Sequence, residues 1–511
     1  MNKDRVHWLN EIGIALSKER RIPFLLEEIL VGAKELTHAD GGTLYTVSSN
    51  QTLKFETLIS DSLHIHIGGS SGLAIPFSNL FLFLENGEPN ESLVVTYSVN
   101  HKKTVNVKDA YYEQGFDFSG TRLFDEKTGY RTQAVLTVPM KNHEDDVIAV
   151  LQLINPKGEN KFFTKEDQQL AESLASQAGI ALNNQLLISQ LQKLFESLIQ
   201  ILAESIDERS PSTSNHGKRV PLITQLFAEG VNETHEGPLK KVYFSEKQRH
   251  ELQVAALLHD CGKITTPDHI IEKKTKLEGL HDRIETINTR LTVLEREVDN
   301  RLLSKKLHWF ETHLQEQPNF SLYEKEAAQE KRQIEENRAF LNRCNRGEEP
   351  MTEEAISRIY KMPFLSGDEK EHLSIPKGNL TEQERKKVEN HVVMTYRMLS
   401  RLHYPKDLQE VPEIAASHHE RVDGKGYPRG LKKEEMSIRA RLLAIADVFE
   451  ALSAPDRSYK ETHLLSEVLD IMKDMVLDGH LDPDLFDVFL KKKIYLQYAR
   501  QYLMPEQIDI D

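Results

Sequence analysis

Hydrophobic residues change their spacing several times along the chain, and each change predicts a different kind of element. Residues 8–39 have the three- and four-residue spacing of amphipathic helices. Residues 41–47, 134–140 and 147–154 are short apolar runs between polar turns, which is typical of β-strands. We therefore expect an antiparallel sheet flanked by helices in the first part of the chain.

One long helix is predicted after this region, from residue 165 to residue 208. Ser210-Pro211-Ser212 ends it, because proline lacks an amide donor and clashes within a helix. Heptad spacing of its aliphatic side chains favours a parallel coiled coil in a homodimer, and a core helix packed within one chain is the alternative. The side chains with this spacing are Leu187, Leu191, Leu194, Leu198 and Ile201.

A second pair of helices is predicted between residues 280 and 341. Pro318-Asn319 separates an apolar stripe from a charged helix over residues 323–341, so we expect an antiparallel helical hairpin. Its alternating charges are most simply a solvated face, with a partner surface or a lid as alternatives. The stripe consists of Leu280, Ile284, Ile287, Leu291, Leu294 and Val298.

Composition limits the class of protein. The 511 residues predict about two to four domains, and 39% hydrophobic with 28% charged residues indicates a globular, soluble chain. The net charge of −15 disfavours partners such as nucleic-acid polymers and anionic membranes. The chain has two cysteines, Cys261 and Cys344, no apolar signal core and no run long enough to span a membrane. We therefore expect a cytoplasmic protein.

Histidine and aspartate residues recur at positions that predict a cluster of divalent metals. His259 and Asp260 close the apolar run 254–258, and His418-His419 follow far downstream. Mixed imidazole and carboxylate ligands without thiolate favour iron or manganese over zinc. The glycines of residues 423–428 permit a tight loop close to the second histidine pair.

The order of these motifs resembles the HD-GYP subfamily of the HD superfamily of metal-dependent phosphohydrolases. The residues that carry the resemblance are His216, His259, Asp260, His391, His418, His419, Gly426, Tyr427, Pro428 and Asp447. The resemblance implies an all-helical HD-GYP domain over residues 196–275 and 376–511, which hydrolyses cyclic di-GMP. In most relatives the two parts are nearly contiguous, so residues 276–375 are a helical insertion in this chain.

The resemblance also implies a ligand set for two divalent ions. One ion would take His216, His259, Asp260 and Asp447, and the other would take Asp260, His391, His418 and His419. A third ion is not favoured, because Ser212 stands where some relatives have a glutamate ligand. Fewer metals are associated in the family with stopping at the linear dinucleotide pGpG rather than proceeding to GMP.

The implied reaction uses a metal-bridging hydroxide that attacks phosphorus in line. Asp260 would be catalytic as the bridging ligand, and Lys263 would bind the phosphate or protonate the departing ribose oxygen, unless it only complements the charge of a helix end. Tyr427 would either stack on a guanine or anchor its own loop. The predicted substrate contacts are Lys263, Lys273, Lys276, Gly426, Tyr427, Pro428, Arg457 and Lys460.

The first 185 residues resemble a GAF domain, most closely those of cyclic-nucleotide phosphodiesterases and adenylyl cyclases. Residues 105–111, 124–125, 128–132 and 139 carry this likeness, and a family motif is represented by Asn155, Lys157, Phe163 and Asp167. Gln168 replaces the final glutamate of that motif. The resemblance implies a sensor for a small molecule or a cyclic nucleotide, and a dimer scaffold without ligand is the alternative.

Together these patterns predict a multidomain α+β and all-α protein: a GAF-regulated phosphodiesterase for cyclic di-GMP. Hydrolysis of another cyclic dinucleotide, such as cyclic GMP-AMP, is a second hypothesis. The third is a catalytically silent cyclic-dinucleotide receptor. Under each of these three hypotheses a protein partner could dock on the insertion or on the loop that contains Gly426, Tyr427 and Pro428.

Overall fold

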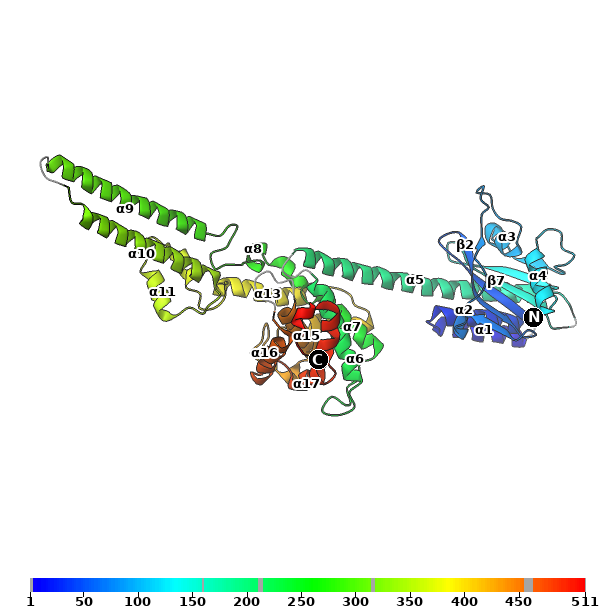
Figure 1. Ribbon diagram of the computed structural model, residues 1–511. Coiled ribbons are helices and arrows are strands. Elements are labelled where there is room, and N and C mark those ends of the chain that lie inside the picture. Colours follow the sequence, from blue (N-terminus) through cyan, green and yellow to red (C-terminus); the bar gives the residue numbers. More distant parts are fainter. Residues whose placement is uncertain (1–2, 159, 210–214, 314–317, 455–462, 511) are drawn as a thin grey trace. The chain divides into compact units, whose positions relative to one another are not determined.

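The computed structural model describes residues 3–158, 160–209, 215–313, 318–454 and 463–510. The chain forms two compact units, residues 1–195 and residues 196–511 (Figure 1). The first is an α+β unit, as the hydrophobic spacing predicts, and the second is built of helices, as the family resemblance implies. Among the described residues we find no helix that is long and apolar enough to cross a membrane.

The first unit is organised around an antiparallel sheet that has seven strands within the described residues. Strands at the predicted positions 41–47, 134–140 and 147–154 are confirmed, with ends that differ by one or two residues. In spatial order the strands are β3 (Ile65–Gly68), β2 (Thr52–Ser60), β1 (Ala39–Val47), β7 (Val147–Pro156), β6 (Val135–Lys141) and β5 (Val105–Val107), and β4 (Leu80–Phe81) pairs with β2.

Successive side chains of β1 and β7 point to opposite faces of the sheet, so each face has its own core. Leu44 and Leu151 pack against helices on one face, and Tyr45 and Val150 pack on the other. The first face is covered by α1 (Lys3–Lys18), α2 (Ile22–Thr37) and the beginning of α5 (Lys165–Arg209); α3 (Val94–His101) and α4 (Ser119–Thr128) lie over the second.

The helical spacing of residues 8–39 corresponds to two helices rather than one. The chain breaks between α1 and α2 because Pro23 lies in the first turn of α2, where its missing amide is tolerated. The long helix predicted over residues 165–208 is confirmed as α5. Its proposed terminator, Ser210-Pro211-Ser212, lies outside the described residues.

The second unit packs helices around α15 (Ile438–Ser453), which is buried along most of its length. Aromatic rings of Phe227, Phe449, Phe489 and Tyr498 meet in its interior. Helices α6 (His216–Asn232) and α7 (Glu246–Leu258) pack against α15, and α13 (Glu382–Leu399) packs against the short helix η3 (Cys261–Thr265). Outside the insertion, the other helices among the described residues of this unit are α8 (Asp268–Ile271), η4 (Lys406–Leu408), α14 (Val411–Ala415), η5 (Lys433–Glu435), α16 (Leu465–Leu477), α17 (Pro483–Lys491), α18 (Ile494–Tyr502) and η6 (Pro505–Gln507).

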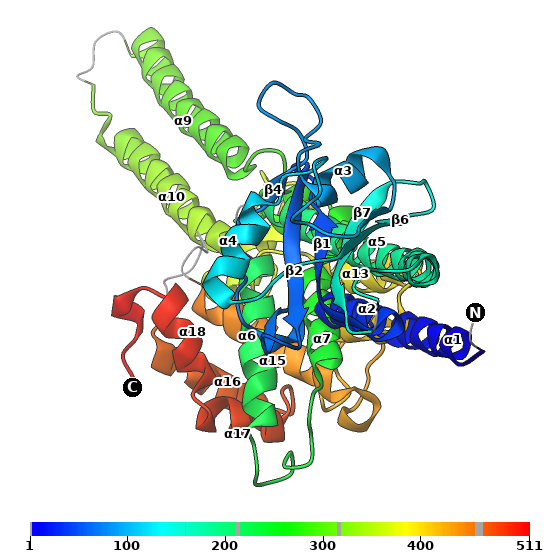
Figure 2. The same ribbon diagram turned by 90° about the vertical axis from the view of Figure 1, so that its right-hand side faces the viewer.

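The predicted helical hairpin is present as α9 (Ile284–Thr312) and α10 (Ser321–Arg346), which run side by side in both ribbon views (Figures 1 and 2). Ion pairs Arg338–Glu295 and Lys306–Glu324 show that the helices are antiparallel. With α11 (Glu353–Tyr360) and α12 (Gly367–Leu373) they enclose a separate hydrophobic core.

The prediction that Leu280 belongs to the buried apolar stripe is wrong. Leu280 is 99% exposed, whereas Ile284, Ile287, Leu291 and Val298 are buried. The helix begins only at Ile284, where the carboxylate of Asp282 accepts the first amide, so Leu280 lies in the preceding loop.

Candidate metal centre

The seven predicted ligands come from five separate segments of the second unit. His216 is the first residue of α6, and His259-Asp260 lie where α7 ends and η3 begins. His391 lies within α13, His418-His419 follow α14, and Asp447 lies within α15. These side chains converge into groups whose nitrogen and oxygen atoms could each hold a metal ion.

The first group is formed by His216, His259 and Asp447. The Nε2 atom of His216 lies 3.1 Å from Nε2 of His259 and 3.3 Å from Oδ1 of Asp447. It also lies 3.4 Å from Oδ2 of Asp260. All four side chains are largely buried, so the cluster is shielded from bulk water.

The second group is formed by His391, His418 and His419. Oδ1 of Asp260 lies 3.4 Å from Nε2 of His391 and 3.9 Å from Nε2 of His418. Asp260 therefore turns one oxygen toward each group, which is the arrangement that a shared carboxylate needs. Bridging of two metals by Asp260 stays a prediction.

Backbone hydrogen bonds orient three of the imidazoles. His259, His391 and His418 each place Nδ1 within 2.5 to 2.7 Å of a carbonyl three residues earlier. A carbonyl can only accept, so Nδ1 carries the proton and Nε2 keeps its lone pair. Among the described residues the buried Nε2 atoms of His391 and His418 find no hydrogen-bond partner. Such orphaned nitrogens fit ligands of a metal ion.

The protonation states of His418, His419 and Asp260 also fit metal binding. Burial lowers the pKa of His418 well below its ordinary value and that of His419 to about 4. Burial alone would raise the pKa of Asp260, but the nearby charge of Lys263 holds it well below the ordinary range. Neutral imidazoles and ionised carboxylates are the forms that coordinate metals.

Sequence reasoning missed two residues that support these ligands. Glu450 is fully buried; one oxygen lies 2.5 Å from Nδ1 of His216 and the other accepts a bond from Arg219 at 2.8 Å. Thr395 accepts the amide of Gly262 and donates to the carbonyl of His259. The sequence signal for Glu450 is its place one helical turn after Asp447, in the mostly apolar second half of α15.

Gly262 allows η3 to approach α13 closely. A Cβ atom on Gly262 would lie 1.9 Å from the carbonyl oxygen of His391, which no side chain tolerates. The glycine of the sequence His259-Asp260-Cys261-Gly262-Lys263 therefore brings the Asp260 segment next to the helix of His391.

The predicted substrate lysines have different surroundings. Nζ of Lys263 lies 2.5 Å from Oδ2 of Asp260, at the metal centre. The ammonium group of Lys273 contacts both oxygens of Glu384 at 2.8 Å. That of Lys276 is buried and donates to the carbonyls of Leu373 and Ile375. In this structure Lys273 therefore ties the chain before the insertion to α13, and Lys276 joins the entry of the insertion to its exit. Phosphate binding by either lysine stays a prediction.

The other predicted substrate residues divide into two groups. Tyr427 stacks on the imidazole of His419, and Gly426 and Pro428 flank it in the same loop. Arg457 and Lys460 lie outside the described residues.

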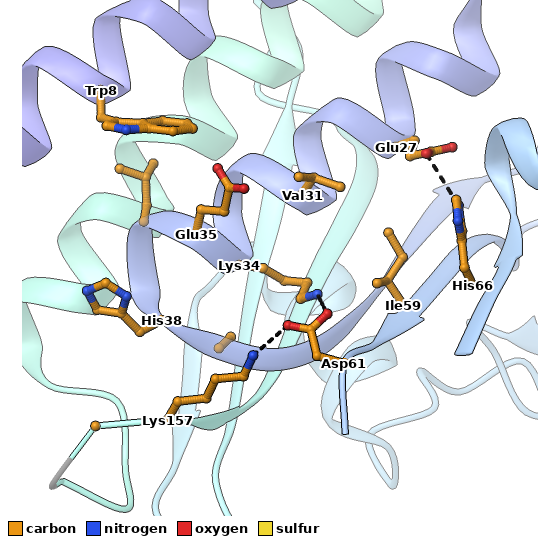
Figure 3. Close-up of a pocket in the computed structure, with 13 residues that line it drawn as sticks. Trp8, Glu27, Val31, Lys34, Glu35, His38, Ile59, Asp61, His66 and Lys157 are labelled. Atoms are coloured by element: carbon orange, nitrogen blue, oxygen red, sulfur yellow. Dashed lines mark hydrogen bonds and ion pairs between the residues drawn. The ribbon is translucent and has the colours of Figure 1, made fainter. Parts of the chain in front are cut away.

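The GAF motif residues hold the first unit together. The side chain of Asn155 accepts the amides of Gln133 and Ala134, and Phe163 lies in the core. Asp167 accepts the amide and the hydroxyl of Thr164 at the start of α5. Lys157 contacts Asp61 at 2.6 Å, on the wall of a cavity of about 930 Å³ beside α1 and α2 (Figure 3).

A second cavity, of about 330 Å³, lies on the opposite face of the sheet below α3 and α4. Its lining is mostly aromatic and aliphatic, and its polar side chains include Thr43, Asp117 and Gln152. An apolar cavity with a few convergent polar groups is the usual form of a small-molecule site.

Comparison with known proteins agrees with both units. The family model of the GAF domain matches residues 24–182. Two family models described as HD domain match residues 213–356 and 367–485. The two HD matches include all seven predicted ligands: His216, His259, Asp260, His391, His418, His419 and Asp447.

Three curated relatives illustrate the range of similar proteins. A 3'3'-cGAMP-specific phosphodiesterase 1 of Vibrio cholerae is 47% identical over 81 residues, covering 16% of this chain and 19% of that protein. A cyclic di-GMP phosphodiesterase of Thermotoga maritima is 40% identical over 127 residues, covering 24% and 33%. A dual 3',5'-cyclic-AMP and -GMP phosphodiesterase 11A of Takifugu rubripes is 26% identical over 201 residues, covering 38% and 21%.

The matches span between 19% and 33% of the length of these relatives, so they concern domains rather than whole proteins. The two HD matches contain the proposed metal ligands, and the GAF match contains the antiparallel sheet. The chain therefore combines an N-terminal domain that matches the GAF family with a helical unit that matches the HD domain.

Proposed function

We propose that this chain is a metal-dependent phosphodiesterase that hydrolyses cyclic di-GMP. The observation that carries the proposal is Asp260, whose two carboxylate oxygens face two separate groups of imidazoles. Many enzymes that catalyse displacement at phosphorus use a pair of divalent ions a few ångströms apart. His216, His259 and Asp447 would hold one ion, and His391, His418 and His419 would hold the other, with Asp260 between them.

Iron or manganese suits this donor set, because every proposed ligand offers nitrogen or oxygen. Cys261 adjoins Asp260 in sequence, but burial raises the pKa of its thiol to about 11, so it stays protonated and is a poor ligand. When bound, the ions would polarise the phosphodiester and make water a stronger nucleophile near neutral pH.

Lys263 is the residue best placed to move a proton. Its ammonium group lies at Asp260 and is about a quarter exposed, so it can reach a phosphodiester that enters the centre. We propose that Lys263 stabilises the negative charge at phosphorus and donates a proton to the departing ribose oxygen. Asp260 lowers the cost of holding this cation in a buried site.

The substrate class rests on relatives that are named cyclic-dinucleotide phosphodiesterases. The 47% identity to a 3'3'-cGAMP-specific relative favours cyclic GMP-AMP as a second candidate substrate. The product we propose is linear pGpG, because Ser212 replaces the glutamate of relatives with three metals. Ser212 lies outside the described residues, so this step rests on the resemblance alone.

We further propose that the GAF domain regulates the reaction by binding a small molecule in the 330 Å³ cavity between the sheet and α3 and α4. The family match supports a ligand-binding domain. Regulation requires that the ligand bind the active and inactive states with different affinity.

A single set of assays tests the proposed function. Protein purified without oxygen is analysed for iron, manganese and zinc, and then supplied with cyclic di-GMP, cyclic GMP-AMP, cyclic AMP and cyclic GMP. We expect about two ions per chain and accumulation of pGpG from cyclic di-GMP. Preferential cleavage of cyclic GMP-AMP would replace the substrate assignment. Tight binding of a cyclic dinucleotide by metal-loaded protein without any cleavage would instead support a receptor.

A further inference from the structure

The loop that follows His418-His419 folds back onto these two ligands. Glu420 is buried, and its two carboxylate oxygens accept the amides of Arg429 and Leu431 at 2.8 and 2.9 Å. One side chain therefore closes the loop of residues 420–431 by two hydrogen bonds to a buried carboxylate. Bonds of this kind to an ionised group are about twice as strong as those between neutral groups.

The closed loop places Tyr427 against His419. The amide of Tyr427 donates to the carbonyl of His419 at 3.2 Å. The two rings are stacked, with centroids 4.8 Å apart and planes inclined by 25°. Gly426 allows this approach, because a Cβ atom there would lie 2.3 Å from the amide nitrogen of Arg421.

His419 differs from the other imidazoles of its group in what orients it. The rings of His391 and His418 are fixed by Nδ1 bonds to backbone carbonyls. Within the described part of the chain no hydrogen bond reaches either ring nitrogen of His419. Its ring contacts are with His391, His418 and Tyr427, and Tyr427 is the one of these that is not itself a proposed ligand.

We propose that Tyr427 and Glu420 are positioning residues for the second metal group: the stacked phenol holds the His419 imidazole in the orientation that a hydrogen bond supplies for His391 and His418. The inference rests on the proposed metal centre, where the loop of residues 420–431 would orient one ligand. Loss of an outer partner of a metal ligand typically lowers metal affinity about 10–100-fold.

Manganese titration of the full-length protein tests this proposal without measuring hydrolysis. Metal-free protein is titrated with Mn²⁺ in competition with a chelator, for the native chain and for Tyr427→Leu, Tyr427→Phe and Glu420→Gln. We expect Tyr427→Leu and Glu420→Gln to weaken one of two binding steps about 10–100-fold and to leave the other unchanged. Tyr427→Phe, which keeps the flat ring, should bind both ions with native affinity. Tyr243→Leu is the matched control, because Tyr243 is 71% exposed.

The turnover number and KM of Tyr427→Leu distinguish a role of Tyr427 in positioning His419 from direct contact with the substrate. If Tyr427 positions His419, excess Mn²⁺ should restore much of the turnover number of Tyr427→Leu and leave KM near native. Native affinity for both ions together with a raised KM in Tyr427→Leu would show that the ring contacts the nucleotide and would overturn the proposal. If Tyr427→Leu fails to fold, as judged by circular dichroism of the metal-free protein, Glu420→Gln decides. A native chain that takes up no metal would refute the metal centre itself, which is a different result.

Discussion

At the scale of single residues, Asp260 is the side chain that lies between the two groups of proposed ligands. Its oxygens lie 3.4 Å from Nε2 of His216 and 3.4 Å from Nε2 of His391. A ligand shared by two ions should matter more than one that serves a single ion, because its loss leaves both ions under-coordinated.

We therefore expect Asp260→Ala to lower the content of both metals and to reduce turnover by more than about a hundredfold. This loss exceeds the roughly 10–100-fold decrease that typically follows the loss of a residue that only supports a metal ligand. Elemental analysis and nucleotide assays on the same preparation measure this. Asp470→Ala is the control, because Asp470 is 70% exposed on the surface. Normal turnover in a metal-replete Asp260→Ala protein would show that the centre lies elsewhere.

Substitution of Lys263 should distinguish an effect on catalysis from an effect on metal binding. Its ammonium contacts Asp260 and so is not itself a ligand. We expect Lys263→Ala to retain both ions and to lose about 10²–10⁴-fold in turnover, the range of a general acid. Lys247→Ala, which removes an exposed lysine that pairs with Asp407, should change neither quantity. A loss of metal in Lys263→Ala would mean that the lysine acts by holding Asp260 in place.

The order of the His and Asp motifs, through its resemblance to the family, named seven side chains that the structure brings together. It did not predict Glu450, whose role appears only when α15 packs against α6 and brings its carboxylate to His216. Nor did it predict the surroundings of Lys276, whose ammonium group is buried and donates to two carbonyls. Burial and partner choice depend on tertiary contacts that spacing does not encode.

At the scale of elements, the insertion is a self-contained unit with its own core. Leu277, Leu341 and Leu373 are fully buried in it, and they come from its entry, its hairpin and its exit. The hairpin beyond this core is joined largely by exposed ion pairs such as Arg301–Glu330 and Lys305–Glu326. Exposed pairs contribute little stability, about 0–1 kcal/mol each.

Replacing residues 300–330 by a short Gly-Ser turn should therefore leave metal content and unstimulated turnover unchanged. The cut lies at the contact between Asp299 and Lys331, where α9 and α10 face each other, so the core stays intact. Thermal unfolding, metal analysis and hydrolysis are measured on the shortened protein. A large change in KM would instead support a lid over the substrate.

Helix α5 exposes the heptad stripe that its sequence predicts. Leu191, Leu194 and Leu198 are 65%, 57% and 51% exposed, which is unusual for leucines at this spacing unless a partner covers them. We propose that a second copy of α5 covers the stripe in a parallel homodimer.

The Leu194→Asp substitution should then raise the dimer dissociation constant by more than about tenfold, because an unpaired carboxylate would be buried in the seam. Analytical ultracentrifugation over a range of concentrations measures this constant. Gln192→Asp introduces the same charge away from the stripe and should leave it unchanged. A monomeric native protein would refute the coiled coil.

At the scale of the whole molecule, α5 is the covalent link from the GAF sheet to the helices of the metal centre. It runs from Lys165 to Arg209, and His216 begins the next helix after a short connection. A ligand in the GAF cavity can change turnover only if its binding energy differs between two states of this link, typically by about 1–3 kcal/mol. A continuous helix can transmit such a difference as a rotation or a shift in register.

Two residues inserted after Asn184 should rotate the part of α5 that follows by about 200° relative to the part that precedes it. The insertion leaves every proposed metal ligand in place, so metal content should be native while the response to a GAF ligand is lost or reversed. Because α5 is helical on both sides of Asn184, the added residues can extend the helix rather than break it. The measurement is turnover with and without a GAF ligand found by thermal-shift screening of the native protein. An unchanged response in the insertion variant would show that the signal passes by another route.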